Sequence, residues 1–71
     1  MATTFNIEAH RPGRPGTTAN GLSRQEAVAK VRELFPQFDE LDARTIVKQA
    51  ALRGEEEYLG NRGESLWVGK N

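Results

Sequence analysis

The large apolar side chains of this 71-residue chain are unevenly distributed, and this constrains its fold more than any other feature. Phe5 and Ile7 lie near the start, and the next large apolar residue is Leu22. A chain of this length has material for one hydrophobic core only. We therefore expect a single small domain over residues 1–71, with a core built mostly by residues 22–68 and one N-terminal segment packed against it.

The first segment has the alternation of a strand. Across residues 3–9, the apolar side chains of Phe5, Ile7 and Ala9 alternate with polar ones, and this period of two predicts a half-buried strand. Residues 10–22 follow, and their prolines and glycines disfavour both a helix and a regular strand ladder. We expect this segment to be a long loop that is either mobile or used in binding.

A strong local signal for a helix begins at Ser23. Its hydroxyl can cap the first turn, while Glu26 reaches back to the Ser23 N–H in a capping box. Pro36 ends the helix, because the residue before a proline is disfavoured in the α region. The spacing predicts a helix over residues 24–35. Its apolar face is formed by Ala27, Val28, Val31, Leu34 and Phe35.

The next segment repeats this logic. Asp39 is placed to cap a second helix, predicted over residues 40–53, and acidic residues occupy its first turn, where the helix dipole favours them. Gly54 can end this helix in the left-handed conformation. The helix could instead continue to Leu59, because one internal glycine costs only about 1 kcal/mol. We favour the end at Gly54.

Two short segments around a glycine-bounded turn, residues 56–59 and 65–69, predict a C-terminal hairpin. The expected fold class is therefore α+β. A single layer of antiparallel strands, made of the N-terminal strand plus the hairpin, packs on a two-helix pair in the order β-α-α-β-β.

Composition excludes several classes of protein. Ten Lys and Arg balance ten Asp and Glu, which argues against a protein that coats DNA by charge alone. The absence of cysteine excludes disulfides, cysteine-ligated zinc and thiol catalysis. No apolar run approaches the length of a membrane span, and the N-terminus lacks the pattern of a secretory signal. We expect a cytoplasmic protein without contact to a membrane.

The chain offers little for catalysis. The segment Gly16–Ser23 has the glycine spacing of a phosphate-binding P-loop, but Leu22 occupies the position of the essential lysine. His10 is the only histidine, and nothing in the sequence places it beside a nucleophile or a set of metal ligands. We expect no enzyme activity, no cofactor and no metal site.

The predicted hairpin carries the large amphipathic rings of Tyr58 and Trp67. Either they pack against the helices or they anchor a partner, since Trp, Tyr and Arg dominate the energetics of interfaces. Arg62, in the turn, would then contribute to the polar rim. The adjacent acidic run would complete that rim or remain solvated; it consists of Glu55, Glu56 and Glu57.

Arg11 and Arg14 lie among the prolines and glycines of the predicted loop. They are candidate contacts to a partner protein. An extended arm with arginines can also enter a DNA groove, so the alternative is a small nucleic-acid-binding accessory protein that uses Arg11, Arg14 and Arg24.

The sequence therefore favours a small non-enzymatic module that binds another protein or protein complex. Its size and character are typical of accessory proteins of phages and mobile elements, including inhibitors of host or defence complexes such as anti-CRISPR proteins. A homodimer formed through an exposed strand edge is a third hypothesis.

Overall fold

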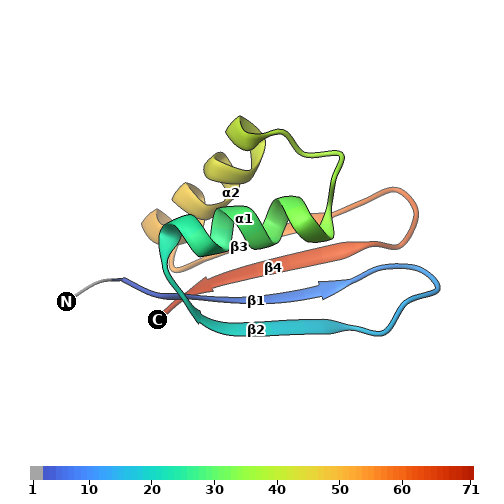
Figure 1. Cartoon of the computed structure of the whole chain (residues 1–71), viewed down its shortest axis with the longest axis horizontal. Coiled ribbons are helices and arrows are strands. Elements are labelled where there is room, and N and C mark those ends of the chain that lie inside the picture. Colours follow the sequence, from blue (N-terminus) through green and yellow to red (C-terminus); the bar gives the residue numbers. More distant parts are fainter. Residues whose placement is uncertain (1–2) are drawn as a thin grey trace.

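The computed structural model describes residues 3–71 and shows an α+β fold with two layers (Figure 1). A four-stranded antiparallel sheet in the order β2-β1-β4-β3 carries both helices on one face. The expected fold class is confirmed, but the sheet has four strands rather than three, and the order is β-β-α-α-β-β. The elements are β1 (Phe5–His10), β2 (Thr17–Leu22), α1 (Arg24–Leu34), α2 (Glu40–Arg53), β3 (Glu55–Leu59) and β4 (Ser65–Lys70).

The long loop expected over residues 10–22 is wrong in its second half. Residues 17–22 form β2, which pairs antiparallel with β1. This edge strand is only half-buried and has Leu22 as its one large apolar residue, so its sequence lacks the apolar alternation of a strand. The strand is held by its backbone hydrogen bonds to β1 rather than by a buried apolar face, and two successive threonines favour its extended backbone.

A β-bulge shapes the end of β2. The register with β1 shifts between Phe5 and Ile7, where Gly21 adopts a left-handed φ of 68°. The Gly21 N–H donates to the side-chain oxygen of Asn6 at 3.1 Å, which satisfies a backbone group that the bulge withdraws from the ladder. The Asn6 amide also donates to the Asn71 side chain at 2.6 Å and so fixes the C-terminus beside β1.

Both helices begin as the sequence predicts. The Ser23 hydroxyl accepts from the Glu26 N–H, and the Glu26 carboxylate accepts from the Ser23 N–H, so the capping box is confirmed. Asp39 caps α2 by accepting from the Asp42 N–H at 2.8 Å. Gly54 ends α2 with a left-handed φ of 89°, so the helix does not continue to Leu59. No helix within residues 3–71 is long and apolar enough to cross a membrane.

The core lies between the sheet and the helices. Strands β1 and β4 contribute alternate residues that are fully buried, and each helix contributes one apolar face, as the alternating and helical periods predict. The principal side chains of this core are Phe5, Ile7, Val31, Phe35, Val47, Leu66 and Val68. The opposite face of the sheet has no layer over it within residues 3–71, and we call it the open sheet face.

Candidate functional site

Three connections meet at one end of the molecule: the β1–β2 turn, the α1–α2 loop and the β3–β4 turn. They enclose a groove of about 610 Å³, which we call the turn-end groove. Its rim carries Arg11, Arg14 and Arg62, and Tyr58 lies beside them. Apolar surface in this groove comes from the exposed Pro12 and Pro36, with the buried Leu34 and Phe35 beneath them.

The backbone positions the arginines of this groove. The Arg11 guanidinium donates to the carbonyl oxygen of Leu34 at 3.3 Å, a carbonyl of the last turn of α1 that has no intrahelical partner. A cation at this end of a helix is also favoured by the helix dipole. The Arg14 N–H donates to the Arg11 carbonyl at 3.2 Å across a turn that contains Gly13 with a φ of 73°. Arg11 is thereby tied to α1.

A cluster of three aromatic rings supports the base of the groove. The rings of Phe38 and Tyr58 lie edge to face, with centroids 4.9 Å apart. Phe35 is 2% exposed and packs against both rings, with its centroid 5.7 Å from that of Phe38 and 6.0 Å from that of Tyr58. These distances are typical of favourable aromatic pairs. The cluster joins the end of α1, the α1–α2 loop and β3, which border the groove.

Two carboxylates lie among the arginines of the turn-end groove. Glu33 forms an ion pair with Lys30 at 2.7 Å. The Lys30 hydrogen bond and charge lower the pKa of Glu33, and the charge of Arg11 lowers it further. Glu64, on the β3–β4 turn, is the second carboxylate. With Lys30 engaged by Glu33, the three arginines and Glu64 leave a cationic rim.

Trp67 lies on the open sheet face, so of the two alternatives considered for it, packing against the helices is wrong. Its neighbours in β4, Leu66 and Val68, are buried beneath the helices, and the alternation of a strand turns Trp67 to the other side. The six-membered part of its ring covers Gly69, where a Cβ atom would collide with it. Tyr58 is the hairpin ring that packs on the helix side.

The acidic run of β3 is divided between the two faces by the same alternation. Glu56 lies opposite Val68, on the helix side, and its carboxylate is 3.8 Å from the Arg53 guanidinium. Glu57 lies opposite Trp67, and Glu55 lies opposite Gly69, so both belong to the open sheet face. Glu57 and Trp67 line a shallow depression of about 250 Å³ together with four residues of β1 and β4, which are Glu8, His10, Ser65 and Leu66.

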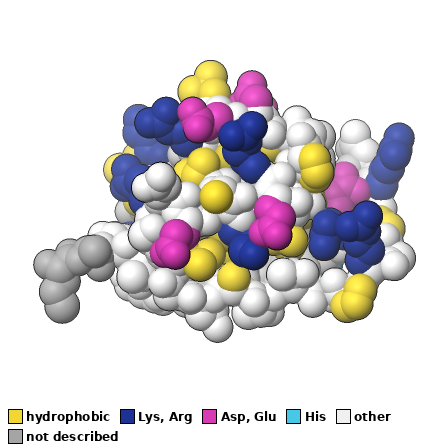
Figure 2. Space-filling model, in the orientation of Figure 1, with side chains coloured by type: hydrophobic (Ala, Val, Ile, Leu, Met, Phe, Trp, Pro, Cys, Tyr) yellow, Lys and Arg dark blue, Asp and Glu magenta, His cyan; other side chains and the backbone are white. Residues whose placement is uncertain are grey.

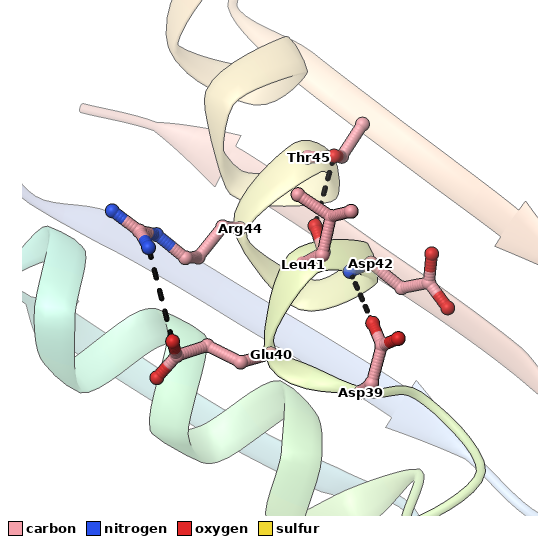
Figure 3. A network of polar contacts seen from close by, with 6 residues as sticks. All are labelled: Asp39, Glu40, Leu41, Asp42, Arg44 and Thr45. Atoms are coloured by element: carbon pink, nitrogen blue, oxygen red, sulfur yellow. Dashed lines mark hydrogen bonds and ion pairs between the residues drawn. The ribbon is translucent and has the colours of Figure 1, made fainter.

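A second large groove, of about 700 Å³, runs between α1 and α2; we call it the interhelical groove. Its charged residues are Arg24 and Arg32 on α1, and Glu40, Arg44 and Lys48 on α2. Lys and Arg side chains gather over the helices in Figure 2, apart from a second group over the turns. Glu40 and Arg44 point toward each other from successive turns of α2 (Figure 3), and their ion pair joins Arg44 Nη1 to Glu40 Oε2 at 3.8 Å.

The structure brings some predicted residues together and separates others. Arg11, Arg14, Tyr58 and Arg62 line one groove, although up to 51 positions separate them in the sequence. Arg24 lies in the interhelical groove, ten residues from Leu34 and therefore roughly 15 Å from the helix end that Arg11 contacts. The three arginines of the nucleic-acid hypothesis thus line two different grooves.

Sequence reasoning missed three cations of the interhelical groove, Arg32, Arg44 and Lys48. The signal was present, because Arg24 and Arg32 are eight positions apart on α1, and Arg44 and Lys48 are four apart on α2. Residues spaced by four lie on one face of a helix. Within residues 3–71, no group of three or more His, Asp or Glu side chains is arranged to hold a metal ion.

Comparison with known proteins gave no match, whether to a family model, to a curated protein or to a solved structure. The fold and the surfaces described above are therefore the basis for the function proposed next.

Proposed function

We propose that this protein is a non-catalytic module that binds another protein or protein complex through the turn-end groove. One observation carries the proposal: Arg11, Arg14, Arg62 and Tyr58 come from two distant hairpins and converge on one groove. Arginine and tyrosine are enriched among the residues that dominate binding energy at protein interfaces. Their position around an apolar centre corresponds to the polar rim and apolar core of such an interface.

The groove is also largely formed in advance. Arg11 is held at the end of α1, and the ring of Tyr58 is held by Phe35 and Phe38. Association is opposed by the entropy of ordering side chains, about 0.5–1.5 kcal/mol for each flexible side chain that is immobilised. A surface whose anchors are already placed loses less of this entropy on binding.

We further propose that the partner belongs to a host or defence complex, and that the chain is an accessory or inhibitor protein of a phage or mobile element, like anti-CRISPR proteins in character. Small size and balanced charge support this class by analogy only. The proposal places the protein in the cytoplasm, where such complexes act.

The test begins with capture of partners from the native host by the tagged protein, followed by mass spectrometry. The tag belongs at the N-terminus, because β1 begins at the end of the sheet away from the turn-end groove. A captured protein is then purified, and its affinity is measured for the wild type and for Arg11→Ala and Arg62→Ala. We expect each variant to weaken binding at least tenfold.

Lys70→Ala is the matched control, because Lys70 is exposed and pairs with Phe5 at the opposite end of the sheet. Affinities that do not change in the groove variants, or the absence of any specific protein partner, would refute the proposal. The nucleic-acid alternative is tested with the same proteins. Retention of DNA or RNA at low salt that is lost in the double variant Arg11→Ala/Arg14→Ala would favour that alternative.

A further inference from the structure

The interhelical groove is a second charged surface, distinct from the turn-end groove. It holds four cations and one carboxylate, Glu40, so its local charge is +3. Glu40 is engaged by Arg44. Within residues 3–71, no carboxylate forms an ion pair with Arg24, Arg32 or Lys48. Charges of one sign gathered in a groove attract a partner of opposite sign.

The width of the groove selects the kind of anionic partner. The axes of packed helices lie about 8–10 Å apart, so the depression between them matches the breadth of one extended chain better than that of a nucleic-acid duplex. A single nucleic-acid strand would need aromatic side chains on which its bases stack. None of the residues that line this groove is aromatic. The base of the groove instead includes Val28 and Ala29, which offer apolar surface to a side chain of a peptide.

The spacing of the arginines predicts the pattern of that peptide. Arg24 and Arg32 are eight residues apart on one helix face, and therefore about 12 Å apart along the axis. In an extended peptide, residues i and i+4 lie on the same side at about 13 Å, with residue i+2 between them. Carboxylates at i and i+4 can each meet a guanidinium, and an apolar residue at i+2 can contact Val28. Arginine suits this task because its planar fork binds a carboxylate through two hydrogen bonds.

We propose that the interhelical groove binds an extended acidic segment of a protein, with the pattern acidic-x-apolar-x-acidic. The site lies on the helix layer, so its occupant does not compete for the residues of the turn-end groove. This inference does not depend on the proposed function, since none of its charged residues belongs to that surface.

The probe is a fluorescein-labelled peptide that contains Glu-Ser-Leu-Ser-Glu, and its binding is followed by fluorescence anisotropy at low and at physiological salt. We expect saturable binding that weakens as salt rises, and that is lost when both glutamates of the peptide are replaced by glutamine. Replacing its leucine by serine should weaken binding about threefold to tenfold, because the apolar contact with Val28 is removed.

Variants of the protein locate the site. Arg24→Gln and Arg32→Gln should each weaken binding about threefold to tenfold, and together more strongly, with circular dichroism confirming that the fold is intact. Lys70→Gln is the control for lost charge, and Arg62→Gln is the control for the turn-end groove; both should bind the peptide as the wild type does. Loss of binding in Arg62→Gln alone would assign the peptide to the other groove and refute this proposal.

Three further outcomes would overturn it: no binding by the wild type, binding by Arg24→Gln and Arg32→Gln that is as tight as that of the wild type, or tighter binding of a single-stranded oligonucleotide of equal length and label. The last result would assign the groove to nucleic acid. Failure of this test leaves the partner capture through Arg11 and Arg62 unaffected, so the two proposals are refuted by different results.

Discussion

The aromatic cluster beneath the turn-end groove permits a quantitative test of what shapes that surface. Phe38 lies in the α1–α2 loop and Tyr58 in β3, and their rings meet edge to face with centroids 4.9 Å apart. Such pairs stabilise proteins by about 0.5–1.5 kcal/mol beyond the burial of their surface. We therefore predict a coupling energy of about 1 kcal/mol in the double-mutant cycle of Phe38→Leu and Tyr58→Leu.

This energy is large for so small a domain. At about 0.05–0.15 kcal/mol per residue, 71 residues give an unfolding free energy of roughly 4–11 kcal/mol. A loss of 1 kcal/mol should lower the melting temperature by about 4–8 °C. Unfolding in urea, followed by far-ultraviolet circular dichroism and by the fluorescence of Trp67, gives the free energies of the wild type and the three variants. Trp67 is the only tryptophan and lies on the open sheet face, away from the substitutions.

Tyr58→Phe is the matched control, because it keeps the ring and removes only the hydroxyl. We expect this variant to unfold within about 0.5 kcal/mol of the wild type. A coupling energy below about 0.3 kcal/mol, the level seen for independent sites, would refute the role given to the Phe38–Tyr58 pair. So would an equal destabilisation by Tyr58→Phe and Tyr58→Leu.

Three further predictions concern the ends of the helices and the open sheet face. Ser23→Ala removes the hydroxyl that caps α1 and should lower the unfolding free energy by about 1 kcal/mol in urea denaturation. Hydrogen bonds from the Ser23 N–H and then from its hydroxyl lower the pKa of Glu26 below 4.5, so this carboxylate stabilises the fold above its unfolded-state pKa, and that stability is lost as pH falls through the folded-state pKa. Glu26→Gln should therefore make the unfolding free energy depend less on pH in the acid range, and a pH profile identical to that of the wild type would contradict this role of Glu26. Gly69→Ala should displace the ring of Trp67 and shift its emission to the red, whereas an unchanged spectrum would show that the ring does not cover Gly69.

The two helices could be predicted closely because their end signals are local. The hydroxyl of Ser23, the carboxylate of Asp39 and the left-handed Gly54 each act on backbone groups within four residues, so the sequence alone contains both partners. Strand β2 could not be found in this way. Its stability comes from pairing with β1, and an edge strand that is only half-buried does not need the apolar alternation by which strands are detected.

The surfaces were harder to predict than the elements. Leu66, Trp67 and Val68 are apolar in succession, so their sequence does not show which of them faces the helices, and only the complete sheet decides it. The turn-end groove likewise depends on tertiary structure, since Arg11 and Arg62 meet only when both hairpins are in place. The interhelical groove was accessible in principle, because its arginines follow the four-residue spacing of a helix face.

The balanced charge of the chain conceals a local excess of positive charge in the interhelical groove. The interhelical groove is cationic, whereas Glu8, Glu55 and Glu57 lie on the open sheet face, across the sheet from the helix layer. Charges in solution are screened over about 8 Å at physiological salt, and the molecule measures 38 × 22 × 19 Å. Carboxylates on the open sheet face are therefore too distant to cancel the field of the arginines on the helix face. A partner that enters the interhelical groove meets a local charge of +3 from the residues that line it, rather than the net charge of zero. Balanced composition argues against a protein that coats DNA over its whole surface, but it does not argue against a single charged docking site.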